Sequence, residues 1–135
     1  MNEKWKEFLK AVEKKCPQTH IYTQPEECLI YSHGCYPREY KWLLKGDYPY
    51  LTRAVVSPAD EAEISEIVKL ANEYEVSIIP YGGGSGIVGG TIPYQGEIMI
   101  DVKRLQDFSI NIVNGTAKAD ALQEAQDTLQ FKMTE

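Results

Sequence analysis

The stretch that most constrains this chain is residues 80–93, PYGGGSGIVGGTIP, which holds six of its ten glycines. Glycine inside a helix or strand is destabilising because it loses the most conformational freedom on folding, so this stretch is predicted to be a loop. Glycine also adopts positive φ and lets the backbone approach a ligand, so successive amides can form an anion-binding concavity. No charged side chain lies between Tyr81 and Gln95. Any phosphate here must be held by backbone N–H groups, helped at most by the hydroxyls of Ser85 and Thr91.

Two common phosphate-binding motifs do not explain the loop. The Walker A motif requires a lysine followed by Ser or Thr after the last glycine, and no lysine follows here. The pattern GxGxxG is matched by Gly84, Gly86 and Gly89, but it requires a helix to begin at the loop. Instead Pro93 and Gly96 disfavour a helix, and EIMIDV alternates like a strand. The dinucleotide match is therefore accidental, and a glycine-rich turn without a ligand is the alternative to a phosphate site.

The segments before the loop predict a βαβ unit. Residues 53–56, RAVV, form a short β-branched strand, and Ser57 with Pro58 supplies an N-cap and a first-turn proline for the next helix. Apolar residues recur along that helix at Ile64, Ile67, Val68, Ala71 and Tyr74, and residues 76–80, VSIIP, form a second buried strand. Such units have parallel strands, and ligands collect at the carboxyl ends of those strands. The expected fold class is α/β (α+β).

The first fifty residues carry weaker signals. Residues 2–15 predict one amphipathic packing helix with an apolar stripe at i, i+3, i+4 and i+7. The stretch 16–50 holds four of the seven prolines and is expected to be an ordered, irregular connection, with a possible short strand at residues 28–31. We therefore divide the chain into residues 1–50, a helix and approach segment, and residues 51–135, which contain the glycine loop.

Composition excludes several functions. With 135 residues and a net charge of −6, the chain is one domain or part of one, and it is not expected to bind nucleic acid. No apolar run is long enough to span a membrane. Three cysteines without a CxxC pattern indicate reduced thiols in a cytoplasmic protein. We expect no metal site, because the metal-capable residues fit no zinc spacing: Cys16, His20, Cys28, His33 and Cys35.

Residues 53–108 resemble the FAD-binding domain of the p-cresol methylhydroxylase (PCMH) and vanillyl-alcohol oxidase type. The similar pieces are RAVVSPADEAEISEIVKLANEYEVSIIPYGGGSGIVGGTIP and GEIMIDVKRLQDF, and YSHGCYPREYKWLLKGDYPYL looks like the approach segment of one branch. Within this type, the chain is most similar to the group of glycolate oxidase, D-lactate dehydrogenase and alkyldihydroxyacetonephosphate synthase. The resemblance covers the N-terminal βαβ subdomain, so the chain is expected to be a truncated, partial PCMH-type domain.

The resemblance implies a cofactor site. Residues 82–86 would wrap the FAD pyrophosphate, and the full set of expected FAD-binding residues is Tyr81, Gly82, Gly83, Gly84, Ser85, Gly86, Gly89, Gly90 and Thr91. Relatives with covalent flavin often place a histidine where Gly84 stands, so FAD is expected to bind noncovalently. The chain ends before the family's second FAD-contacting segment and its cap domain, and no catalytic residue can be assigned.

Three functions remain open at this stage. The first is the FAD-binding portion of an oxidoreductase of small 2-hydroxy acids, incomplete as a catalyst by itself. The second is an FAD protein of ether-lipid synthesis similar to alkyldihydroxyacetonephosphate synthase. The third is a noncatalytic remnant, or a half-domain whose cleft is completed by a second polypeptide or a homodimer.

After Phe108, the sequence predicts a turn at Asn114 and Gly115 and a helix with a weak apolar stripe at residues 121–129.

Overall fold

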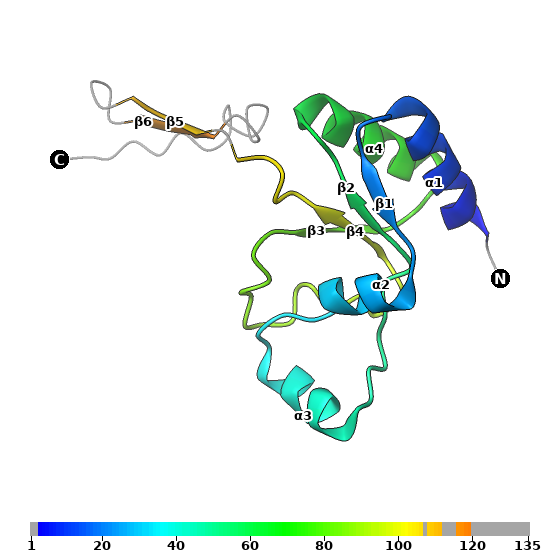
Figure 1. Cartoon of the computed structure of the whole chain (residues 1–135), viewed down its shortest axis with the longest axis vertical. Coiled ribbons are helices and arrows are strands. Elements are labelled where there is room, and N and C mark those ends of the chain that lie inside the picture. The colour runs from blue at the N-terminus through cyan, green and yellow to red at the C-terminus, as the bar shows by residue number, and fades with distance from the viewer. Residues whose placement is uncertain (1–2, 107, 112–115, 120–135) are drawn as a thin grey trace.

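A four-stranded mixed sheet forms the centre of the protein. The computed structural model describes residues 3–106, 108–111 and 116–119. The strands are β1 (His20–Tyr22), β2 (Val55–Ser57), β3 (Ile78–Tyr81) and β4 (Ile98–Asp101), in the order β1-β2-β4-β3. Strands β2 and β3 both pair in parallel with β4, and β1 pairs antiparallel with β2. The predicted βαβ unit is confirmed, with β4 inserted between its two strands (Figure 1).

Helices α1 (Lys4–Lys15) and α4 (Glu61–Glu73) pack together over one face of this sheet (Figure 1). The predicted stripe of α1 is confirmed, since Phe8 and Val12 are fully buried against Ile67 and Leu70 of α4. Burying side chains of this size stabilises the fold by about 1.5–3 kcal/mol each. These two helices and alternate sheet residues make the larger of the two hydrophobic clusters.

The predicted N-cap of α4 is wrong by three residues. Ser57 is the last residue of β2, and the cap is Asp60, whose carboxylate accepts a hydrogen bond from Glu63 N at 2.9 Å. The chain uses Pro58 and Ala59 to turn from the sheet plane onto the helix axis, so the first residue with a free side chain for capping is Asp60. Its charge also suits the positive end of the helix.

Glu63 ties the start of α4 to the segment that follows α1. Its carboxylate accepts hydrogen bonds from Gln18 N, Thr19 Oγ1 and Ala59 N, at 2.8–2.9 Å. Burial alone would raise the pKa of Glu63, but these hydrogen bonds outweigh it and lower the pKa below its ordinary value. The neighbouring Cys16 thiol is buried, and burial together with the Glu63 charge raises its pKa to about 11.

The stretch expected to be irregular contains two helices, α2 (Pro25–Tyr31) and α3 (Pro37–Lys45), besides β1. The predicted strand at residues 28–31 is wrong, because these residues form the second half of α2. Both helices begin with a proline at the first helical position, where its fixed φ suits the helix and its missing N–H costs nothing. Helix α2 packs on β2, near the smaller core cluster of Val55, Tyr81 and Met99.

The described chain ends in a separate two-stranded sheet. Strands β5 (Phe108–Asn111) and β6 (Thr116–Ala119) pair antiparallel, with Ser109 opposite Lys118. The turn expected at residues 114–115 and the helical stripe expected at 121–129 lie outside the described residues. Among the helices that are described, none has the length and apolar composition needed to cross a bilayer.

Candidate functional site

The glycine loop connects β3 to β4 and begins at the carboxyl end of β3. It leaves the sheet after Tyr81 and re-enters it at Ile98 (Figure 1). Its second half is anchored, since Ile92 and Pro93 are buried. Of the predicted FAD-binding residues, Tyr81 and Gly89 are buried and Gly84 and Thr91 are half-buried, whereas the others lie exposed: Gly82, Gly83, Ser85, Gly86 and Gly90. The structure therefore brings the nine predicted residues into one loop that is open to solvent at its glycine-rich first half.

The backbone amides of this loop are free to bind a ligand. Among the described residues, no hydrogen bond is donated by a backbone N–H of residues 82–91; the first amide of the loop with a protein acceptor is that of Ile92, which donates to Gly89 O. Backbone N–H groups are almost always paired when they are buried, so a run of ten unpaired ones is compatible only with contact to water or to a ligand. Together with the missing charge between Tyr81 and Gln95, this makes the backbone amides the groups of this loop that are suited to hold an anion.

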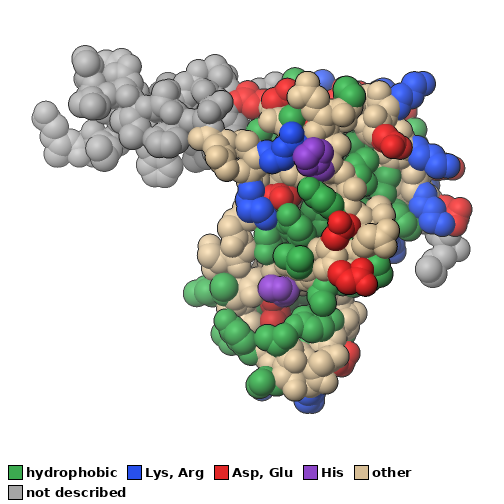
Figure 2. All heavy atoms as spheres, viewed as in Figure 1, with side chains coloured by type: hydrophobic (Ala, Val, Ile, Leu, Met, Phe, Trp, Pro, Cys, Tyr) green, Lys and Arg blue, Asp and Glu red, His purple; other side chains and the backbone are tan. Residues whose placement is uncertain are grey.

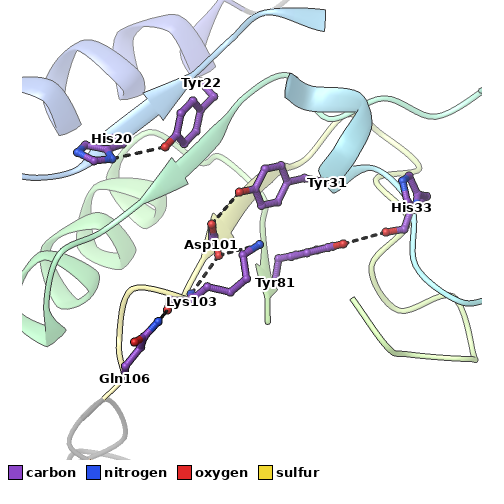
Figure 3. A network of polar contacts seen from close by, with 8 residues as sticks. All are labelled: His20, Tyr22, Tyr31, His33, Tyr81, Asp101, Lys103 and Gln106. Carbon is purple, nitrogen blue, oxygen red and sulfur yellow. Dashed lines mark hydrogen bonds and ion pairs between the residues drawn. The ribbon is translucent and has the colours of Figure 1, made fainter. Parts of the chain in front are cut away.

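Gly84 has a backbone geometry that other residues could adopt only at a cost. Its φ is +66°, and a Cβ atom at this position would lie 2.9 Å from Cζ of Tyr81 and nearer still to the Tyr81 hydroxyl. That hydroxyl donates to the carbonyl of His33 at 3.1 Å (Figure 3). Burial, followed by the charge of Asp101, raises the pKa of Tyr81, so the phenol stays a neutral donor. The Tyr81 ring thus packs against Gly84 and fixes the loop at this residue.

Residues 33–35 form a second support for the loop. Cys35 N donates to Gly86 O at 3.2 Å, and a Cβ on Gly34 would lie 3.0 Å from Thr91 Oγ1 and 3.2 Å from Gly84 O. Only glycine permits so close an approach at residue 34. The position of this segment is fixed in turn by Glu39 of α3, whose Oε2 accepts a hydrogen bond from Gly34 N at 2.6 Å.

Glu39 and Gly34 are site residues that the sequence analysis did not identify. The available signal was Pro37 followed two residues later by a glutamate, since an acidic side chain in the first turn is typical of a helix N-terminus. That signal predicts α3 and the place of Glu39 in it. The contact of Gly34 with the glycine loop joins segments about fifty residues apart, and no local pattern predicts such a contact.

A buried polar cluster lies beside the loop at the carboxyl ends of β3 and β4 (Figure 3). Asp101 is buried and accepts hydrogen bonds from the Tyr31 hydroxyl at 2.8 Å and from Lys103 N at 3.0 Å. The Lys103 ammonium lies 3.3 Å from Asp101 Oδ1 and above the rings of Tyr31 and Tyr81, at 4.3 and 4.9 Å from their centroids. Burial and the hydrogen bond to Asp101 raise the pKa of Tyr31. The cluster clamps α2 to the end of the sheet and places one cation next to the loop.

Exposed apolar side chains extend from the loop to α3. Ile87 and Val88 of the loop are 68% and 83% exposed, and Leu44 of α3 is 87% exposed. Tyr94 and Leu43 are each more than half exposed. Figure 2 shows hydrophobic side chains gathered over the end of the molecule that carries α3 in Figure 1. We call these five residues the apolar surface; solvent-exposed groups of this kind mark contact sites for other molecules or chain segments.

The sequence profile of the FAD binding domain family matches residues 52–123, which is more than half of the chain. The chain belongs to this family. The FAD-binding domain is of the PCMH type, and relatives include glycolate oxidase, D-lactate dehydrogenase and alkyldihydroxyacetonephosphate synthase. The geometry of this domain fits a dinucleotide, since an uncharged loop with unpaired amides is suited to a diphosphate.

The relatives are much longer than this FAD-binding domain. Mitochondrial D-lactate dehydrogenase [cytochrome] of Arabidopsis thaliana is 44% identical over 52 residues, which cover 38% of this chain and 9% of that protein. Glycolate oxidase subunit GlcD of Bacillus subtilis is 32% identical over 90 residues, which cover 66% of this chain and 17% of that protein. The chain therefore spans less than a fifth of either relative.

Solved structures of FAD proteins share the fold of this chain, and the chain again covers only a part of each. A structure of alkyldihydroxyacetonephosphate synthase superposes with a TM-score of 0.72 and 26% identity, covering 83% of this chain and 21% of that one. p-Cresol methylhydroxylase with substrate bound superposes with a TM-score of 0.65 over 95% of this chain and 25% of that one; at 12% identity it shows the fold alone. Within the described residues, no three metal-capable side chains of the FAD-binding domain come together.

Proposed function

We propose that the chain binds FAD noncovalently through residues 81–91, with the diphosphate on the backbone amides of the glycine loop. The observation that carries this proposal is the run of unpaired amides, among the described residues, at the carboxyl end of β3. The hydroxyls of Ser85 and Thr91 are further donors in the same loop. The family to which the chain belongs supports FAD as the dinucleotide.

Noncovalent attachment is supported by the position of Gly84. A residue with a nucleophilic side chain at this position would have to adopt φ of +66° and displace the Tyr81 ring. Left-handed backbone conformations are costly for residues other than glycine, and here the steric conflict adds to that cost. FAD released into the filtrate after denaturation of the holoprotein would agree with the proposal, whereas flavin fluorescence that stays on the denatured polypeptide would contradict it.

We further propose that this FAD-binding portion serves an oxidoreductase that oxidises a small 2-hydroxy acid by hydride transfer to the flavin. The names of the relatives, D-lactate dehydrogenase and glycolate oxidase, support this substrate class. A second candidate is an FAD protein of ether-lipid synthesis, favoured by 43% identity over 54 residues to the alkyldihydroxyacetonephosphate synthase of Dictyostelium discoideum and by the 0.72 TM-score. A catalytic test of the two needs the remainder of the flavin fold, because no acid or base can be assigned in this chain.

The remainder of the fold is proposed to come from a second polypeptide that packs on the apolar surface. Three of its side chains, Leu44 of α3 and Ile87 and Val88 of the glycine loop, are more than two-thirds exposed. Sedimentation of the purified chain with and without FAD distinguishes the partners. A monomer that stays in solution agrees with a missing second polypeptide. A yellow dimer indicates that a second copy completes the cleft. Colourless protein that aggregates without forming a defined dimer favours the noncatalytic remnant.

We propose that the protein works in a reducing compartment, the cytoplasm. Cys16 and Cys28 are buried free thiols, and Cys35 is an exposed free thiol. An exposed free cysteine is typical of compartments in which glutathione keeps thiols reduced. Relatives named as mitochondrial provide the competing location. Fractionation of cells that express the complete reading frame with a C-terminal tag would decide, and recovery in mitochondria would contradict the proposal.

The central experiment is an FAD titration of the ¹⁵N-labelled chain. An open loop encloses little of a ligand, and pockets that bind tightly bury most of their ligand's surface, so we expect a dissociation constant weaker than about 1 µM. The amide resonances of residues 82–86 should shift most. Amides that stay unchanged at millimolar FAD would refute the binding site. A dissociation constant below about 1 µM would refute the inference that the isolated loop leaves the cofactor largely uncovered.

A further inference from the structure

The carboxylate of Glu39 is only half satisfied. The side chain is 5% exposed, and its Oε2 accepts the hydrogen bond from Gly34 N at 2.6 Å. Its Oε1 is buried and has no hydrogen-bond partner among the described residues. Glu39 is the third residue of α3, a helix of nine residues, so its side chain belongs to the first turn at the positive end of the helix.

An unpaired buried carboxylate oxygen calls for a donor. Buried side-chain polar atoms in native proteins nearly always have a partner, and an exception marks a place where a ligand or water completes the set. An ionised carboxylate can only accept hydrogen bonds, so the missing partner is an N–H or O–H group. Glu39 accepts a hydrogen bond from Gly34, and the next residue, Cys35, donates its N–H to Gly86 O of the glycine loop. A Cβ on Gly34 would lie 3.0–3.4 Å from Thr91 Oγ1 and the carbonyl oxygens of Gly84 and Gly86, so this segment lies close to the loop.

We propose that Glu39 is a ligand-binding residue whose Oε1 accepts a hydrogen bond from a sugar hydroxyl of the dinucleotide on the glycine loop. This inference rests on the proposed function. A carboxylate repels a diphosphate, so Glu39 cannot contact the phosphates themselves. The hydroxyls next to the diphosphate, on the ribose and on the ribityl chain, are the donors that match an acceptor-only group. Glu39 would thus select a nucleotide over a simple anion at this loop.

The test compares Glu39→Gln with Glu13→Gln, which removes the same charge from an exposed position on α1. Glutamine at position 39 keeps one acceptor for Gly34 N and replaces the other with a donor. The probes are ADP, which carries the ribose hydroxyls, FMN, which carries the ribityl hydroxyls, and inorganic pyrophosphate, which has neither. Binding is measured by calorimetry or by amide shifts on the folded chain.

We expect Glu39→Gln to weaken the binding of ADP or of FMN by roughly tenfold, the size of one hydrogen bond to a charged group. Pyrophosphate binding should be unchanged or stronger, and Glu13→Gln should match the wild type with every probe. Unchanged affinity of the variant for both ADP and FMN overturns the role of Glu39. Failure of the wild type to bind any probe, pyrophosphate included, instead refutes the proposed function.

A measurement on the wild-type chain covers the case in which Glu39→Gln does not fold. The ¹³C resonance of the Glu39 carboxyl carbon should move on addition of ADP or FMN and stay in place with pyrophosphate. A carboxyl resonance that responds to no probe, while the loop amides shift with ADP or FMN, overturns the proposal.

Discussion

Gly84→Ala should destabilise the protein although the residue lies in a loop. Alanine would have to keep φ near +66°, which costs about 1–2 kcal/mol for a residue with a Cβ. The new methyl group would also displace the Tyr81 hydroxyl from the His33 carbonyl, and the loss of that hydrogen bond costs about 0.5–1.5 kcal/mol. Repacking of the buried Tyr81 ring adds to this, so we expect a total of about 2–4 kcal/mol. Domains of this size have about 5–15 kcal/mol of stability in all.

Urea denaturation measures this loss, and Gly83→Ala is the matched control. A Cβ on Gly83 meets no atom within 4 Å, and its φ lies outside the left-handed region, so alanine there should be neutral or slightly stabilising. The same methyl group would lie on the open face of the loop and should weaken FAD binding. A Gly84→Ala chain within about 0.5 kcal/mol of the wild type would refute the argument that the Tyr81 ring fixes the loop.

Three further outcomes follow from the buried polar groups. Tyr31→Phe should lower the free energy of unfolding by about 1 kcal/mol, and combining it with Asp101→Asn should cost less than the sum of the two changes; an additive double-mutant cycle would show that the pair does not interact. Because the pKa of Glu63 is lower in the folded state, its contribution to stability is present above its ordinary pKa near 4.5 and is lost as the pH falls through the lower folded value. Acid titrations of the unfolding free energy should therefore be flatter for Glu63→Gln, and identical slopes would contradict this. At pH 8, a thiol reagent should label Cys35 quickly and Cys16 only on unfolding, since the Cys16 pKa is about 11; fast labelling of both would contradict its burial.

The sequence predicted three of the four strands of the sheet and helices α1 and α4 because those segments have strong local signals, whereas strand β1 was missed. Short β-branched runs gave β2, β3 and β4 to within two residues, and the apolar stripe gave α1. Helix α2 was missed because seven residues have too few apolar positions for a period to show. Helix α3 does carry apolar residues at helical spacing, Tyr40, Leu43 and Leu44, and this pattern was overlooked among the prolines and tyrosines of the segment. The other local signals of these two helices are the prolines at their first positions, the acidic residues that follow, Gln24 before α2 and Gly46 at the end of α3. They are stable because of tertiary contacts, which a periodicity analysis does not detect.

The candidate site also combines features that local sequence shows with tertiary contacts that it does not show. The glycines of the loop are evident in the sequence, but the shape of the loop is set by residues outside it. Tyr81 belongs to the core cluster with Val55 and Met99, and its ring fixes Gly84, while Cys35 N holds Gly86 O. A loop held by protein contacts before a ligand arrives has less entropy to lose on binding. A chain that began at residue 51 would keep every glycine of the motif and the Tyr81 ring, but it would lose the hydrogen bonds to the His33 carbonyl and from Cys35 N. We therefore expect residues 33–39 to contribute to the affinity of the proposed site by holding the loop in shape.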